Sequence, residues 1–214
     1  MLKTRGALVA LVLAAALPGC KIIKTPTPEE KAAAAAKSAF DPATKVDAIW
    51  QSQVQPGIEK RAGDLKTVLQ AIAANPDDAG AKYGNPRKQA SSPWTYAVKL
   101  SGKIVAADTA SRAGSLDVDV DGDGKADAKV QIGPAIRGTA LRDALDFLDF
   151  NEFRNQIEWA QFGKAFNEKA NSSFLAALPR NGLTGKTVTV TGAFPLPPSG
   201  QLPLITPSAL TLGQ

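Results

Sequence analysis

Five aspartates alternate with other residues in the stretch DVDVDGDGKADAKV, which spans residues 117–130. Counted from Asp119, the stretch has carboxylates at the first, third, fifth and ninth positions of a calcium loop, a glycine at the sixth and a main-chain carbonyl at the seventh. This spacing predicts a structural Ca²⁺ site. The predicted ligands are Asp119, Asp121, Asp123, Lys125 through its carbonyl, and Asp127.

The same stretch also fits a hairpin that binds no ion. Val130 stands at the twelfth position, where an EF-hand loop has its bidentate glutamate. Alternating Asp and Val is typical of a strand with one solvated face, and glycine-rich segments such as DGDG form turns unaided. The sequence therefore leaves two alternatives, a turn held by calcium and a bare turn.

The missing residue types exclude most catalytic chemistries. The chain contains no histidine, and its one cysteine is Cys20. Ser-His and Cys-His nucleophilic pairs and ordinary zinc sites are therefore excluded. A carboxylate-based glycan hydrolase of the cell envelope remains as an alternative, because it needs only two carboxyl groups facing one cleft.

A second candidate site lies in RGTALRD, residues 137–143. Arg137 and Arg142, with Thr139 and the amides of an expected helix start, would suit an anionic group. Alternatively, Arg142 pairs with a nearby carboxylate. Asn155 and Gln156, close to Trp159, would suit a sugar surface, although Trp159 also fits the core.

The first residues resemble a lipoprotein export signal. Lys3 and Arg5 precede an apolar run, and LPGC ends at Cys20. We expect a signal peptide over residues 1–19, lipidation of Cys20 and a tether over residues 20–30, which contains TPTPEE. The residue after Cys20 is Lys rather than Asp, which favours the outer membrane and a periplasmic location.

Residues 31–90 are rich in good helix formers, which predicts a helical segment. Asp41-Pro42 is a helix start signal. Pro56 is expected to begin one further helix that continues to Asn75, with apolar residues from Ile58 to Ile72 on one face.

From residue 91 the hydrophobic period changes to that of strands. The pattern predicts a strand broken by a turn at Ser101-Gly102, the hairpin of residues 115–132, and two closing strands. A helical insert spans residues 139–178, with Thr139 capping its first helix and Phe153–Lys169 forming the second, whose Ile157, Ala160 and Phe166 face inward. We therefore expect an α+β protein, with the helical segment packed on an OB-like five-stranded barrel over residues 91–214 and the insert between strands 3 and 4.

Three stretches, FDPATKVDAIW, IGPAIRGTALRDAL with FRNQIEWA, and GKTVTVTGAF with LITPSAL, resemble a bacterial family of predicted periplasmic lipoproteins of unknown function. The family is often found beside sugar-type ABC transporter genes. The resemblance covers most of the chain beyond the signal and implies a location and an OB-like barrel, but no activity and no site residues.

These observations favour a non-enzymatic lipoprotein that acts as a binding or accessory module. It would be held at the membrane by its lipid, with an envelope protein or a sugar transport component as partner. We expect no nucleic-acid partner, because the formal net charge is only +5, removal of Lys3 and Arg5 would lower it further, and no long basic run is present.

Overall fold

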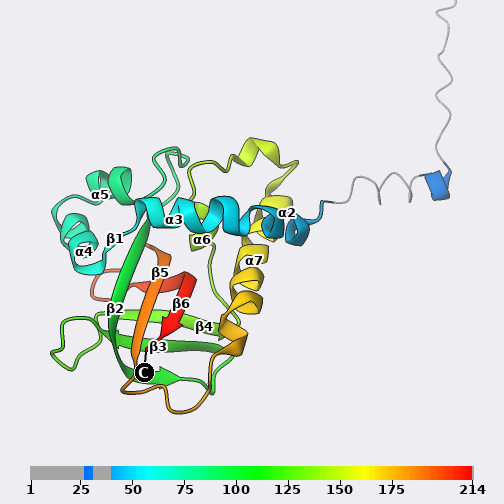
Figure 1. Ribbon diagram of the computed structural model, residues 1–214. Coiled ribbons are helices and arrows are strands. Elements are labelled where there is room, and N and C mark those ends of the chain that lie inside the picture. The colour runs from blue at the N-terminus through cyan, green and yellow to red at the C-terminus, as the bar shows by residue number, and fades with distance from the viewer. Residues whose placement is uncertain (1–26, 31–39, 214) are drawn as a thin grey trace, which may run out of the picture. The chain divides into compact units, whose positions relative to one another are not determined.

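The computed structural model describes residues 27–30 and 40–213 (Figure 1). The chain divides into two units, Met1–Ala39 and Phe40–Gln214. In the first, residues 28–30 form a helical turn in which Glu30 N donates to Thr27 Oγ1 and Thr27 N donates to the Glu30 carboxylate, a reciprocal cap. The expected signal peptide, Cys20 and most of the tether lie outside the described residues.

The second unit contains a closed barrel of five strands. The sheet order is β1-β2-β3-β4-β6-β5, in which β1 is the two-residue strand Gly63–Asp64 at the edge, and pairing of β2 with β5 closes the barrel. The parallel pairing of β4 with β6 covers only Lys129–Val130 and Leu204–Ile205. The predicted OB-like barrel with an α+β composition is confirmed. Its strands are β2 (Thr95–Asp108), β3 (Ala113–Asp119), β4 (Ala128–Pro134), β5 (Thr187–Pro195) and β6 (Leu204–Leu212).

Strand β2 runs through the position where a turn was predicted, so that prediction is wrong. Residues 95–103 of β2 pair with β5, and residues 103–108 pair with β3, with a register shift in the second pairing between Ile104 and Ala106. Gly102 permits this crossing, because a Cβ there would lie 2.3 Å from the carbonyl oxygen of Asp119. One long strand thus serves two sides of the barrel, and the glycine marks a close approach of two backbones.

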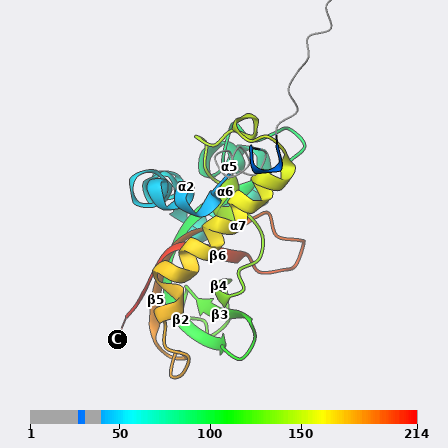
Figure 2. The ribbon, with the colours of Figure 1, turned by 90° about the vertical axis from the view of Figure 1, so that its right-hand side faces the viewer.

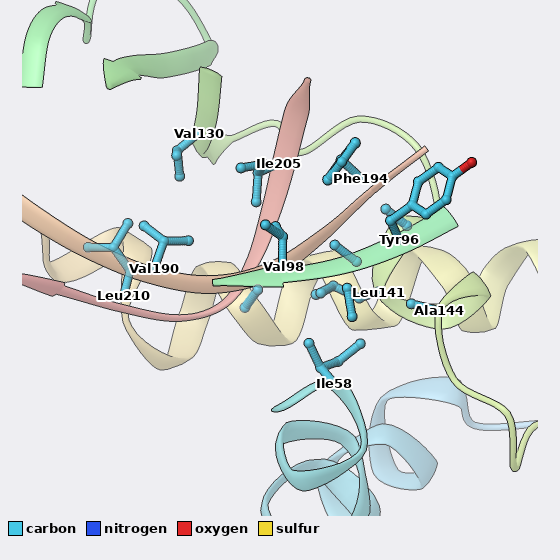
Figure 3. Close-up of a cluster of buried hydrophobic side chains, with 14 of the residues drawn as sticks. Ile58, Tyr96, Val98, Val130, Leu141, Ala144, Val190, Phe194, Ile205 and Leu210 are labelled. Atoms are coloured by element: carbon cyan, nitrogen blue, oxygen red, sulfur yellow. The ribbon is translucent and has the colours of Figure 1, made fainter. Parts of the chain in front are cut away.

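The alternating apolar residues of the hairpin fill the barrel. Leu116, Val118, Ala128, Val130 and Ile132 are fully buried, as the period of two predicts. Figure 3 shows Val130 and Ile205 among the barrel side chains, while Ile58 approaches from helix α3 (Gln55–Arg61) and Leu141 from the insert. The barrel interior and the helical layer therefore share one hydrophobic core.

Residues before β2 form a series of short helices. Asp41 caps α2 through hydrogen bonds from Ala43 N and Thr44 N, which confirms the predicted start. The prediction of a single helix from Pro56 to Asn75 is wrong. The helix is interrupted at Gly63, where a Cβ would lie 2.6 Å from the Tyr83 ring, and Asp64 caps a new helix. The elements are α2 (Pro42–Ile49), π-helix η1 (Trp50–Val54), α3 (Gln55–Arg61), the two-residue strand β1 (Gly63–Asp64), α4 (Leu65–Ala74) and α5 (Pro76–Tyr83).

The insert between β4 and β5 is dominated by α7, which runs along the side of the barrel (Figure 2). The first insert helix is a single turn, and the Thr139 hydroxyl donates to the Asp143 side chain and caps no main-chain N-H. Phe166 is buried as predicted, whereas Ile157 is 68% exposed and Ala160 is exposed, so those two predictions are wrong. The insert comprises α6 (Ala140–Asp143), 3₁₀ helix η2 (Phe150–Glu152), α7 (Gln156–Ser173) and 3₁₀ helix η3 (Leu175–Ala177).

Candidate functional site

The acidic loop, residues 119–127, connects β3 to β4 and is held by its own side chains. Asp119 is 4% exposed, and its carboxylate accepts hydrogen bonds from the main-chain N-H groups of Asp121, Gly122 and Gly124, the last two at 2.6 and 2.9 Å. Val120 N donates to the Asp127 carboxylate at 2.7 Å. Gly122 and Gly124 have φ values of +83° and +85°, which glycine adopts freely. The loop therefore needs no ion to satisfy these buried groups.

Three of the predicted metal ligands lie close together. Carboxylate oxygens of Asp119, Asp121 and Asp127 are all within 4.8 Å of one another. Asp123 instead accepts a hydrogen bond from Lys125 N at 2.8 Å, and its carboxylate also lies 3.9 Å from the exposed Lys125 ammonium. Three carboxylates in this arrangement are the hard oxygen ligands that Ca²⁺ takes.

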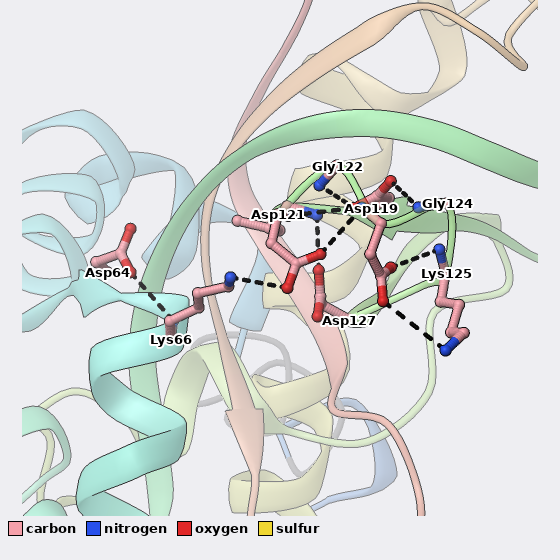
Figure 4. Close-up of polar contacts among 10 residues, drawn as sticks. Asp64, Lys66, Asp119, Asp121, Gly122, Gly124, Lys125 and Asp127 are labelled. Carbon is pink, nitrogen blue, oxygen red and sulfur yellow. Dashed lines mark hydrogen bonds and ion pairs between the residues drawn. The ribbon is translucent and has the colours of Figure 1, made fainter.

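Lys66 supplies a positive charge to the acidic loop from α4 (Figure 4). Its Nζ lies 2.8 Å from Asp121 Oδ2. This hydrogen bond raises the pKa of Lys66 and lowers the pKa of Asp121. An ammonium group from a distant helix thus occupies one side of the cluster that a bound cation would also use. No local pattern predicts this contact, because Lys66 and Asp121 are far apart in the chain.

Arg142 forms the centre of a second polar cluster. Its side chain is 9% exposed, and Nε and Nη2 donate to Asp143 Oδ1 at 2.8 and 2.6 Å. Nη1 donates to the Trp159 carbonyl, and the guanidinium carbon lies 4.1 Å from the centre of the Trp159 ring. Thr139 donates to the other oxygen of Asp143. Of the two alternatives left open for Arg142, the structure therefore contains the ion pair. Helix α6 has four residues, which is too short for its N-terminus to form an anion site.

A cleft of about 320 Å³, here called the insert cleft, lies beside this cluster. One wall is the loop of residues 85–93 that follows α5, and the other is formed by residues 142–159 of the insert. Both segments lie at the top of Figure 1. Polar, charged and aromatic side chains line it together, which is a composition suited to orienting a small ligand. They are Asn85, Arg87, Lys88, Gln89, Ser92, Arg142, Asp143, Asp149, Phe150, Asn151 and Trp159.

The walls of the insert cleft are fixed by buried contacts. Asn85, which is 8% exposed, donates from Nδ2 to the Leu145 carbonyl at 2.9 Å and accepts from Arg87 N at 2.8 Å. Trp159 packs edge-on against Phe153 at 4.9 Å between ring centres. The first contact fastens the loop to the insert, and the second anchors the aromatic wall in the core.

Only one residue of the predicted ligand-binding set lines the insert cleft, namely Arg142. Arg137 is exposed on the loop before α6, and Thr139 is bound to Asp143. Asn155 caps α7 by accepting from Ile157 N and Glu158 N, and Gln156 is exposed. The sequence did not reveal the wall of residues 85–93, which carries no motif and comes close to the insert only through the fold.

A larger and more open hollow, the α2–β6 groove, has a volume of about 630 Å³. It lies between the π-helix η1, the end of α7 and the last residues of β6. Its charged residues Asp47 and Lys169 are paired at 2.8 Å. Since each neutralises the other, this groove offers fewer unsatisfied charges to a small polar ligand than the insert cleft does.

The fold and the site together define an OB-fold protein with a helical insert and a polar cleft. Residues 10–211 match the family of predicted periplasmic lipoproteins known as DUF2291, and the chain belongs to this family. It is also similar to an OB-fold protein from Thermotoga maritima, at 20% identity and a TM-score of 0.62, over 81% of this chain and 98% of that one. That likeness concerns the fold.

No curated protein matches the chain. Among residues 27–30 and 40–213, none of the helices combines the length and apolar character that crossing a membrane requires.

Proposed function

We propose that the protein is a non-enzymatic binding module of the cell envelope, and that the insert cleft holds a small polyhydroxylated ligand. The observation that carries the proposal is the composition of the cleft, where planar amides and carboxylates stand beside aromatic rings. Hydroxyl groups both donate and accept, so they match such a mixed set, while an aromatic ring accommodates the apolar face of a ring-shaped ligand.

The cleft carboxylates are better suited to binding than to hydrolysis. A glycan hydrolase of this kind uses a pair of carboxyl groups. Both oxygens of Asp143 accept hydrogen bonds, from Arg142 and Thr139, whereas Asp149 accepts two from Asn151 at Oδ1 alone, so Asp149 is the one lining carboxylate that keeps a free oxygen. A nucleophile or a general base needs an oxygen free to meet the reacting atom. This favours the binding module over the alternative of a carboxylate-based glycan hydrolase.

The family description and the LPGC signal at Cys20 support anchoring by an N-terminal lipid, with the outer membrane as the proposed location. In that position the module would serve an envelope protein or a sugar transport component. A Cys20→Ser substitution should release the protein from the membrane fraction of the cell. Retention of that variant in the membrane fraction would contradict the lipid anchor.

A thermal melt with a panel of neutral sugars and sugar derivatives tests the binding proposal, because a ligand of the folded state raises the midpoint by mass action. Gln89→Ala removes an exposed amide of the cleft, and Gln161→Ala removes an exposed amide of α7 outside it. We expect at least one ligand to raise the midpoint, less in Gln89→Ala than in Gln161→Ala. If no member of the panel shifts the midpoint, the proposed function is wrong.

Calcium binding by the acidic loop is a separate proposal, supported by the three clustered carboxylates. Its role would be structural, because a cation would offset the repulsion among them. A melt in calcium and in chelator tests it, and equal midpoints would contradict it.

A further inference from the structure

We infer that the ligand of the insert cleft is a hydroxylated anion, whose negative group is bound by Arg87 and Lys88. This inference rests on the proposed function and specifies its ligand class. It is carried by the partners of the two cations: both line the cleft, and both are held by neutral groups.

Arg87 is positioned without being neutralised. Its Nη1 donates to the main-chain carbonyl of Asp146 at 3.2 Å. The carboxylate of Asp146 is already bound by Arg61, with the guanidinium 2.5 Å away. Among the described residues no carboxylate lies within ion-pair distance of Arg87, and its remaining N-H groups match the fork geometry of a carboxylate or phosphate.

Lys88 is also held in place by neutral groups rather than by a carboxylate. Its Nζ donates to the carbonyls of Gln89 and Ala90, each at 3.3 Å, and lies 4.5 Å from the centre of the Trp94 ring. These contacts fix the ammonium beside the cleft and leave its charge without a carboxylate partner in the part of the chain described. Arg87 and Lys88 therefore form two adjacent cations on one wall, and Asn85 fastens that wall to the insert.

The other charges of the cleft define the rest of the ligand. Arg142 and Asp143 neutralise each other, so Asp149 is the one lining carboxylate without a cation. The lining groups thus carry one excess positive charge, beside a carboxylate that repels a second anionic group and accepts hydrogen bonds from hydroxyls. A ligand with one anionic end and a hydroxylated body fits both walls. A sugar carboxylate and a sugar phosphate share this chemistry.

Binding of four probes, glucose, glucuronate, glucose 6-phosphate and inorganic phosphate, measured by calorimetry on the full-length protein in detergent, tests the inference. We expect a sugar anion to bind at least about tenfold more tightly than glucose, since hydrogen bonds between charged groups are stronger than neutral ones. Added salt should weaken the binding of the anion more than that of glucose. The relative affinities of glucuronate and glucose 6-phosphate identify which anionic group the cleft prefers.

The double variant Arg87→Gln and Lys88→Gln should abolish the preference for the anion. A matched control, Lys99→Gln with Arg112→Gln, makes the same change in net charge at exposed positions outside the cleft and should keep it. An unchanged preference in the Arg87 and Lys88 variant would overturn the inference, provided that far-ultraviolet circular dichroism shows it folded.

The probes also separate this inference from the proposed function. If glucose and the sugar anions bind equally well, the anion inference is wrong while the binding function stands. If inorganic phosphate binds as tightly as the sugar anions, the hydroxylated part of the inference is wrong. If none of the probes binds, this inference is wrong, and the wider panel of sugars decides the proposed function.

Discussion

The guanidinium of Arg142 lies 4.1 Å from the centre of the Trp159 ring while its N-H groups bind Asp143 and the Trp159 carbonyl. This contact ties α6 to the first turns of α7 and builds one side of the insert cleft. A side chain that is 9% exposed yet charged is tolerated because it is paired, stacked and hydrogen-bonded at once.

Replacing Arg142 with methionine should lower the free energy of unfolding by about 3 kcal/mol, because it leaves Asp143 without its cation in a partly buried position. Arg112→Met, at an exposed position, is the control and should change it by less than about 0.5 kcal/mol. Urea unfolding measures both. Equal stability of the two variants would show that the cluster contributes little to the fold.

Lys66 and a bound calcium ion should compete for the acidic loop. Removing the ammonium by Lys66→Met leaves Asp121 without its partner, so calcium should raise the melting midpoint of this variant more than that of the unchanged protein. Asp121→Asn, which removes a ligand, should reduce the effect. If calcium leaves all three proteins unaffected, the loop is a bare turn.

Stability at high pH should depend on Tyr96. Burial, with a smaller contribution from the charge of Asp77, raises the pKa of Tyr96 to about 12. The phenol is neutral below its pKa, so its stabilising effect is fully present below about pH 10, the pKa in the unfolded chain. It is lost as the pH rises from there through 12. Tyr96→Phe should therefore lose less stability than the unchanged protein between pH 10 and 12. Chemical unfolding at several pH values measures this difference. Equal losses of unfolding free energy in the two proteins would contradict the raised pKa of Tyr96.

Gly102 should tolerate no side chain. In Gly102→Ala the new Cβ would meet the Asp119 carbonyl oxygen, and relief of that clash would push β3 and the acidic loop away from β2. We expect a loss of about 1–3 kcal/mol in unfolding free energy. Lys103→Ala, at the exposed neighbouring position, should cost far less. A neutral Gly102→Ala would mean that the two backbones are further apart than described.

The sequence predicted those elements whose signal is local. Alternation of Leu116 and Val118 with aspartates predicted the β3–β4 hairpin, and Asp41-Pro42 predicted the start of α2, because side-chain period and capping act within a few residues. The break at Gly63 escaped prediction, because it depends on the distant ring of Tyr83.

The candidate site was predictable in part, for the same reason. The spacing of the aspartates revealed the acidic loop, whereas its counter-ion Lys66 comes from α4, far away in sequence. The walls of the insert cleft are residues 85–93 and residues 142–159, which the fold brings together. Of the residues that line it, only Arg142 belonged to the predicted ligand-binding set. Contacts between distant segments depend on how the elements pack, and a single sequence does not encode that packing locally.

A residue-resolved NMR titration with a sugar that raises the melting midpoint shows where on the protein the ligand binds. If the insert cleft is the ligand site, the main-chain amide signals of Gln89, Asn151 and Trp159 shift together as the sugar is added. Shifts confined to the α2–β6 groove, at residues such as Gln51 and Thr211, would contradict it.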